Sequence, residues 1–265
     1  MKKFGSIRLS RNDLSWLHKT FFRVLGVSPD HKLRFMFLNK LLISRIANKS
    51  VLNVLDAGCG EGDYSFFFSE KFPHAQIDSV DIDESRIARN QALASVATIN
   101  NISFRVQDLE NFNEENKYDI MCCVDVLEHI PNQKKVLENL DNALKPGGLF
   151  YIHLPIKKER PVIFDKYITD FHHWAEEEHL ADDITKDEFL LLLEAVGFRV
   201  IEVWPTFNHY LGELTVSLTM LFGKKNIVNQ LVRAFLSPLM NVLVGLDLAI
   251  KNKKGNAVAI VVTKE

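Results

Sequence analysis

The chain has 265 residues, of which 47% are hydrophobic and 25% are charged, which is the composition of an ordinary globular protein. This length fits one large domain, or one domain with insertions. The formal net charge of −2 argues against a dedicated nucleic-acid binder, because such proteins usually carry a strong basic excess, so no nucleic-acid partner is expected.

All three cysteines fall in or beside predicted core strands, at Cys59, Cys122 and Cys123. They indicate buried free thiols in a reducing compartment, and they lack the CxxC spacing of a metal cluster. The N-terminus shows no apolar signal-peptide core, and no run of about twenty apolar residues predicts a membrane span. We therefore expect a cytoplasmic protein, with membrane association left open.

The first fifty residues predict an N-terminal helical cap. A helix is expected over 31–47, because apolar residues recur at helical spacing. These residues are Leu33, Phe37, Leu38, Leu41 and Leu42. Such an extension either covers a ligand cleft or packs on the edge of a sheet, and the sequence favours neither.

A glycine-rich turn follows the first predicted strand, in the segment Val51-Leu-Asn-Val-Leu-Asp-Ala-Gly-Cys-Gly-Glu-Gly-Asp63. An apolar strand over 51–55 leads to Asp56, and an apolar helix is expected over 64–72. The glycines between them allow positive φ angles and a close approach of a ligand to the backbone. The N-terminus of the helix offers free N–H groups to a polar or anionic group. This pattern predicts a nucleotide-type cofactor site.

Strands and helices alternate through the rest of the chain. Further strands are expected at 77–81, 102–106, 118–124, 149–154, 198–204 and 257–263. Helices are expected over 84–97 and 132–144, and a capping box at Thr185 and Glu188 starts another, which ends at Gly197. The pattern predicts a doubly wound, mainly parallel α/β sheet of seven strands. We divide the chain into the cap (1–50), the cofactor-binding core (51–205), an insertion (206–255) and the last strand (256–265).

The insertion, 206–255, is rich in apolar residues, and its segments 211–222 and 227–250 both predict helices. It is too long for a simple hairpin connection, so we expect a role of its own. A lid over the active site, a wall for an apolar substrate, and a contact with an anionic membrane between flanking lysines are all open. So are a helical pair that completes the core and a homodimer contact.

Acidic residues stand at the carboxyl ends of three successive predicted strands, at Asp56, Asp81 and Asp108. Asp81 is placed where a carboxylate can accept both ribose hydroxyls of an adenosine, and Asp108 where a side chain can meet the adenine amino group. The dinucleotide fingerprint needs G-x-G-x-x-G, whereas the glycines here are spaced G-x-G-x-G. An NAD-dependent dehydrogenase is therefore disfavoured.

At this point the chain resembles the class I S-adenosylmethionine-dependent methyltransferases, in their ubiquinone-biosynthesis-like branch (methyltransferase types 11 and 12). The turn at 54–62 resembles motif I, and Val80-Asp81-Ile-Asp resembles motif II. The segment Tyr118-Asp-Ile-Met-Cys-Cys-Val-Asp-Val-Leu-Glu-His-Ile-Pro131 and the following Leu144-Lys-Pro-Gly-Gly148 resemble the blocks around the fourth and fifth strands. Glu194-Ala-Val-Gly-Phe-Arg-Val resembles the entry to the sixth strand. The resemblance covers about residues 50–204 and implies a Rossmann-like methyltransferase fold.

The resemblance implies a role for each matching residue at the cofactor. Gly58, Cys59 and Gly60 shape the loop around the methionine part, which Asp56 orients. The adenosine contacts are Asp81 at the ribose, Ile82 at the adenine face, and Asp108 with the Leu109 backbone at the adenine amino group. The backbone at Cys123 and Val124 meets the methionine amine, and Arg34 is a candidate partner for the methionine carboxylate.

Methyl transfer is an in-line displacement at a sulfonium carbon, so the protein mainly positions the acceptor. A hydroxyl acceptor also loses a proton, for which a histidine near neutral pH is suited. We favour His129, just after the fourth strand, followed by the pair His172 and His173. His153, near the end of the fifth strand, and His179 are further candidates, and each of these histidines also fits a structural role.

A divalent metal is a further option, because Asp125, Glu128 and His129 share one side of a helical turn. Some quinone-type and small-RNA 2′-O-methyltransferases hold a metal on a similar turn with a further histidine, for which His172 or His173 is available here. The alternative is that Glu128 and His129 only order the loop.

The sequence thus predicts an S-adenosylmethionine-dependent methyltransferase acting on a small or lipid-like acceptor, with oxygen as the leading choice of atom. The first alternative is a small-RNA or protein methyltransferase. The second is a scaffold protein that binds the cofactor without turnover.

Overall fold

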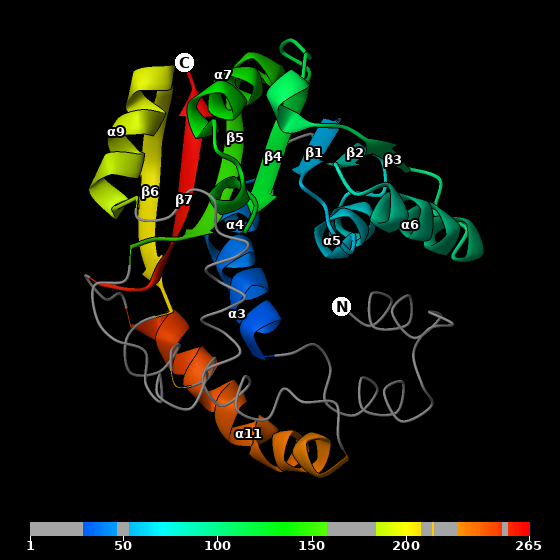
Figure 1. Ribbon diagram of the computed structural model, residues 1–265, viewed down its shortest axis with the longest axis vertical. Coiled ribbons are helices and arrows are strands. Elements are labelled where there is room, and N and C mark those ends of the chain that lie inside the picture. The colour runs from blue at the N-terminus through cyan, green and yellow to red at the C-terminus, as the bar shows by residue number, and fades with distance from the viewer. Residues whose placement is uncertain (1–28, 47–52, 158–183, 208–213, 215–226, 251–253) are drawn as a thin grey trace.

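The computed structural model describes residues 29–46, 53–157, 184–207, 214, 227–250 and 254–265 (Figure 1). Three parts of the sequence-based prediction lie outside these residues. They are the first part of the N-terminal cap, the polar segment that holds His172, His173 and His179, and the first predicted helix of the insertion.

A seven-stranded sheet forms the centre of the fold, in the order β3-β2-β1-β4-β5-β7-β6. All neighbouring strands are parallel except β7, which runs antiparallel to β5 and to β6. The strands are β1 (Asn53–Ala57), β2 (Gln76–Asp81), β3 (Ile102–Val106), β4 (Tyr118–Val124), β5 (Leu144–Pro155), β6 (Phe198–Thr206) and β7 (Ala257–Lys264). The predicted doubly wound sheet is confirmed.

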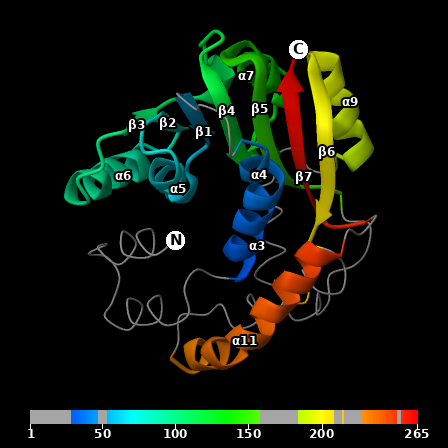
Figure 2. The same ribbon diagram turned by 180° about the vertical axis from the view of Figure 1, so that it is seen from behind.

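Helices cover both faces of the sheet (Figures 1 and 2). One face carries α3 (Pro29–Leu38), α4 (Ser44–Ile46), α5 (Asp63–Lys71) and α6 (Glu84–Val96). The other carries α7 (Gln133–Ala143) and α9 (Lys186–Val196), with the short helical turns η2 (Leu109–Asn111) and η3 (Leu127–His129) in the loops after β3 and β4. Because both faces are covered, β4 is almost wholly apolar, with Asp119 as its one charged residue.

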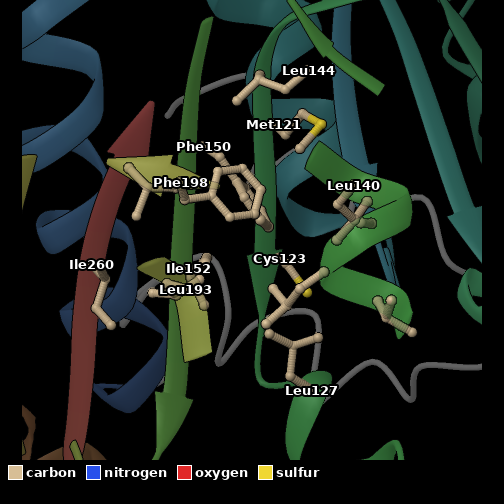
Figure 3. Close-up of a cluster of buried hydrophobic side chains, with 14 of the residues drawn as sticks. Met121, Cys123, Leu127, Leu140, Leu144, Phe150, Ile152, Leu193, Phe198 and Ile260 are labelled. Atoms are coloured by element: carbon tan, nitrogen blue, oxygen red, sulfur yellow. The ribbon is translucent and has the colours of Figure 1, made fainter. Parts of the chain in front are cut away.

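The largest apolar core lies between the sheet and the helices α7 and α9 (Figure 3). Leu140 and Leu193 project from the two helices onto Cys123, Phe150 and neighbouring residues of the strands. The second core lies under α3 on the opposite face, where Phe37, Leu38 and Leu42 of the N-terminal segment are fully buried. The described part of the cap therefore packs on the sheet.

Two elements differ from their prediction by more than a shift of one or two residues at an end. Strand β5 begins at Leu144 instead of residue 149, because the Pro-Gly-Gly segment stays paired with β7 through an irregularity between Pro146 and Leu149. Gly147 makes this possible with a φ of 72°. The predicted helix over 31–47 is divided, since a turn of π-helix, η1 (Asn39–Ile43), separates α3 from α4.

Helix α11 (Ile227–Ala249) lies between β6 and β7 in the chain and packs against α3. It stands on the side of the sheet to which the carboxyl ends of β4 and β6 point (Figures 1 and 2). The helix predicted over 227–250 is present. None of the described helices combines the length and apolarity that crossing a bilayer requires.

Candidate functional site

The glycine turn is fixed to β2 by its backbone. The N–H groups of Gly58 and Cys59 both donate to the carbonyl of Val80, at 2.9 and 2.8 Å. Gly58 has a φ of 75°, and a Cβ there would lie 2.3 Å from Cγ2 of Val126, in the loop after β4. Only glycine fits such a site, because both the backbone angle and the space exclude a side chain.

Asp81 holds the second glycine of the turn. Its Oδ2 accepts the N–H of Gly60 at 2.7 Å, and its Oδ1 accepts the N–H of Asp83 at 2.9 Å. The next residue, Ile82, leaves 72% of its surface exposed although it is large and apolar. The structure thus places a carboxylate beside an exposed apolar side chain, and the ribose and adenine contacts that the resemblance implies stay predictions.

Asp56 lies buried at the end of β1, beneath the turn. Its Oδ2 accepts the hydroxyl of Ser65 at 2.6 Å, and the Cys122 thiol lies 3.6 Å from its Oδ1. Burial raises the pKa of Asp56 to about 6, against the lowering effect of these hydrogen bonds. The side chain thus joins β1 to α5, and its role in orienting the turn stays a prediction.

Asp108 ends the loop after β3 and caps η2. Its Oδ1 accepts the N–H of Glu110 at 2.9 Å, and its Oδ2 accepts the side-chain amide of Asn111 at 2.8 Å. Leu109 beside it is buried, so its backbone is fixed. Each oxygen of the Asp108 carboxylate therefore already accepts one hydrogen bond within η2. An adenine amino group at Asp108 would have to share one of these oxygens.

A network of four polar side chains joins the carboxyl ends of β4, β5 and β6. Asp125 follows β4 directly and pairs with Nε of Arg34 in α3, at 2.5 Å from its Oδ2. Its Oδ1 lies 2.6 Å from Nδ1 of the buried His153, whose Nε2 lies 3.0 Å from the hydroxyl of Thr206. Arg34 also lies over the ring of Phe207, 5.0 Å from its centre.

Left-handed backbone occurs at Asp125 and at Phe207, which follows Thr206 directly. Asp125 has a φ of 54° and Phe207 a φ of 50°, although neither is glycine. Such conformations cost on the order of 1 to 2 kcal/mol for a residue with a side chain and cluster at functional sites. The network therefore joins the glycine turn and the Asp81 region as part of the candidate site at the carboxyl edge of the sheet.

Glu128 is buried within η3, with its Oε2 left without a hydrogen-bond partner among the described residues. Burial, followed by the negative charge of Asp125, raises the pKa of Glu128 to about 9. Its Oε1 lies 3.9 Å from Nε2 of His129, whose side chain is 36% exposed. His129 therefore faces solvent at the end of β4, whereas His153 is enclosed by the network.

The metal hypothesis is not supported by the described residues, among which no group of three or more suitable side chains is placed to hold an ion. Both Asp125 oxygens face nitrogen atoms, and the nearby Arg34 guanidinium would repel a cation. The set Asp125, Glu128 and His129 does not fit a metal in this arrangement. The fourth ligand suggested from the sequence, His172 or His173, lies outside the described residues.

The structure brings most of the predicted site residues to one edge of the sheet, namely Arg34, the Asp56–Gly60 turn, Asp81, Ile82, Asp108, Val124, Asp125, Glu128 and His129. Sequence reasoning missed Thr206 and Phe207, because they follow an unremarkable apolar strand. The sequence could have indicated these two residues only through the predicted sheet, because the carboxyl ends of β4, β5 and β6 lie on the same side of it.

A family model for a methyltransferase domain matches residues 48–197, which is more than half of the chain. The chain belongs to the class I S-adenosylmethionine-dependent methyltransferases. The matched range begins just before β1 and ends at the start of β6, so it holds the turn, Asp81, Asp108 and Asp125 but not Arg34, Thr206 or α11.

Individual relatives agree with this assignment. The chain is 34% identical over 102 residues to malonyl-[acyl-carrier protein] O-methyltransferase 2 of Ilyobacter polytropus, covering 38% of this chain and 39% of that protein. It is 24% identical over 185 residues to a ubiquinone biosynthesis O-methyltransferase of Acinetobacter baumannii, covering 64% and 76%. The chain thus spans about two fifths of the length of the first of these relatives.

Solved structures show the same fold. A geranyl diphosphate methyltransferase superposes with a TM-score of 0.64 at 12% identity, over 97% of this chain and 94% of the other. A coclaurine N-methyltransferase superposes with a TM-score of 0.62 at 15% identity, over 98% and 82%. At these identities the superpositions establish the fold alone.

Proposed function

We propose that this methyltransferase transfers the methyl group of S-adenosylmethionine to a small-molecule or lipid-like acceptor, at an oxygen atom. The observation that carries the cofactor part of the proposal is the turn, in which Asp81 accepts the N–H of Gly60 and Ile82 is exposed beside it. The names of the relatives support oxygen as the acceptor atom, since two of them are O-methyltransferases.

The residues of the site divide the work of binding the cofactor. Asp81 and Ile82 would take the adenosine, with Asp108 and the Leu109 backbone at the adenine. The turn from Gly58 to Gly60, with the backbone at Val124, would enclose the methionine part. Arg34 would receive the methionine carboxylate, which requires its guanidinium to share or leave Asp125.

The bound cofactor supplies a methyl group activated on a sulfonium, so the chain's own residues position the acceptor and remove its proton. We propose His129 as the group that accepts the proton, because its imidazole is partly exposed in the loop after β4 and histidine is the commonest general base. His172 and His173 remain proposals for the same role. His153 is suited instead to hold Asp125 in place, because both of its ring nitrogens already face a partner.

Isothermal titration with S-adenosylhomocysteine tests the cofactor site. We expect binding to the wild-type chain and a loss of affinity of tenfold or more in Asp81→Asn, about 1 to 3 kcal/mol for a charge-assisted contact. Asp119→Asn is the matched control, because Asp119 also accepts a backbone N–H, that of Asn53 at 2.9 Å, but stands at the opposite edge of the sheet. Equal affinity in the two variants would refute the ribose assignment, and tight NADH binding without S-adenosylhomocysteine binding would refute the cofactor.

Turnover is tested by supplying labelled S-adenosylmethionine and cell extract, and by following the label with mass spectrometry. We expect a labelled small molecule that survives treatment of the extract with ribonuclease and protease. Label lost with either treatment would favour the RNA or protein alternative. Binding without any labelled product would favour the scaffold alternative.

A further inference from the structure

Helix α11 turns one apolar face to solvent. Phe235, Leu239, Val242 and Leu246 have exposed fractions of 85%, 53%, 59% and 44%. Their spacing of four, three and four residues places them on one line along the helix, which we call the α11 stripe. The line extends over about 17 Å, at a rise of about 1.5 Å per residue.

The stripe is not the face by which the helix packs on the protein. Met240 and Val244 are 2% and 0% exposed, and Val244 belongs to the core beneath α3. The ammonium of Lys40 donates to the carbonyl of Leu248 at 2.8 Å, which fixes the end of α11 to η1. The opposite face of α11 is thus the one that packs on the protein. A contiguous apolar surface that stays outside the core marks an interaction site.

The charge of the segment around the stripe differs from that of the whole chain. Between residues 214 and 256 there are six basic residues and a single acidic one, Asp247, although the chain as a whole has a net charge of −2. Five of the basic residues flank the helix in sequence, namely Lys224, Lys225, Lys251, Lys253 and Lys254. An apolar stripe on a helix that two basic clusters flank in sequence is complementary to a surface that is apolar inside and negative outside.

We propose that the α11 stripe docks this protein on an anionic lipid surface. A second copy of the chain would meet the six basic residues with one acidic residue of its own, whereas anionic headgroups supply the missing negative charge. None of the described helices is long and apolar enough to cross a membrane. In the proposed docking, α11 lies along the interface with its exposed side chains in the acyl boundary.

Docking would also orient the candidate site. Helix α11 packs on α3, from which Arg34 reaches Asp125, and it stands on the side of the sheet where the strands of the site end (Figures 1 and 2). A bilayer held against α11 would lie beside this edge. The docking itself does not depend on methyl transfer, so the two proposals succeed or fail separately.

Co-sedimentation with vesicles tests the docking. We expect the wild-type protein to bind vesicles of equal phosphatidylglycerol and phosphatidylcholine at least about tenfold more strongly than vesicles of phosphatidylcholine alone. The double variant Phe235→Ser/Leu239→Ser should lose at least about tenfold in binding to the anionic vesicles. Val96→Ser/Leu191→Ser is the matched control, because these side chains are 73% and 65% exposed on α6 and α9 and should leave binding unchanged.

A gain of signal keeps the proposal testable if the double variant folds poorly. Phe235→Trp should shift its fluorescence to shorter wavelength on addition of anionic vesicles, and Leu191→Trp should not. Equal binding of the stripe and control variants, or no shift from Phe235→Trp, would overturn the proposal. A different pair of results would also overturn it and would favour a second copy of the chain as the partner. In that case light scattering detects a dimer that Phe235→Ser/Leu239→Ser dissociates, and the wild-type protein does not bind vesicles.

Discussion

At the scale of single residues, the site depends on residues whose close surroundings make substitution measurable. Gly58 is the clearest case, because Val126 leaves no room for a Cβ and the φ of 75° lies in the left-handed region. Asp56 is another, since it is an acid buried beneath the turn with a hydroxyl and a thiol as neighbours. Each leads to a measurement that separates its local effect from the general cost of substitution.

Gly58→Ala should destabilise the protein by several kcal/mol, about 1 to 2 from the backbone angle and the rest from overlap with Val126. Gly147→Ala isolates the first contribution, because Gly147 has a φ of 72° but no atom within 4 Å of an added Cβ. Urea unfolding of both variants gives the difference, and Val126→Ala should restore part of the loss in Gly58→Ala. Equal losses in the two glycine variants would contradict the steric argument.

Asp56 makes the stability of the unliganded protein depend on pH. Burial raises the pKa of this carboxyl from 3.8 to about 6, so the folded protein keeps a proton that the unfolded chain has already released. The unfolded state binds fewer protons in this interval, so the stability from Asp56 is complete below pH 3.8 and is lost as pH rises to about 6.

Asp56→Asn has no such titration. Its unfolding free energy relative to wild type should therefore increase by about 2 to 3 kcal/mol between pH 4 and pH 7, as a shift of about two pKa units requires. Denaturant unfolding at a series of pH values measures the difference, with the exposed Asp187→Asn as a control for the change of charge. Parallel stability curves for wild type and Asp56→Asn would show that the carboxyl ionises without cost.

At the scale of elements, helix starts and strand ends have separate functions. Helix α9 begins at a complete capping box, in which Thr185 accepts the N–H of Glu188 and the Glu188 carboxylate accepts the N–H of Thr185 at 2.8 Å. This helix packs on β6 and α7. The carboxyl ends of β4, β5 and β6 instead carry the polar network of Asp125, His153 and Thr206.

Thr185→Ala should cost about 1 kcal/mol of stability, because the first turn of α9 loses one of its side-chain acceptors. The affinity for S-adenosylhomocysteine should not change, because α9 contributes no residue to the candidate site. Thermal unfolding and isothermal titration check the two statements, with Glu194→Ala at the exposed end of the same helix as the control. A change of affinity with Thr185→Ala would mean that α9 communicates with the site.

At the scale of the whole molecule, the residues of the candidate site come from inside and from outside the range that the family model matches. The matched range, 48–197, holds the turn and the acidic strand ends. Arg34, Thr206 and α11 come from outside it, yet the fold brings Arg34 and Thr206 to Asp125. The proposed lipid contact of α11 also lies outside the matched range.

The sequence by itself determined the strands, the turn and the acids at the strand ends, because alternating patterns and glycine spacing are local signals. It also determined the class of cofactor, since that depends on a few residues at fixed spacing. It did not reveal the partners of Asp125 or the exposed stripe of α11. Arg34, His153 and Thr206 lie 91, 28 and 81 positions from Asp125 in the sequence, and only the closing of the sheet and the packing of α3 bring them together. Which apolar face of α11 is buried was likewise decided by its contact with α3, because the helix is apolar on both sides and its periodicity does not choose between them.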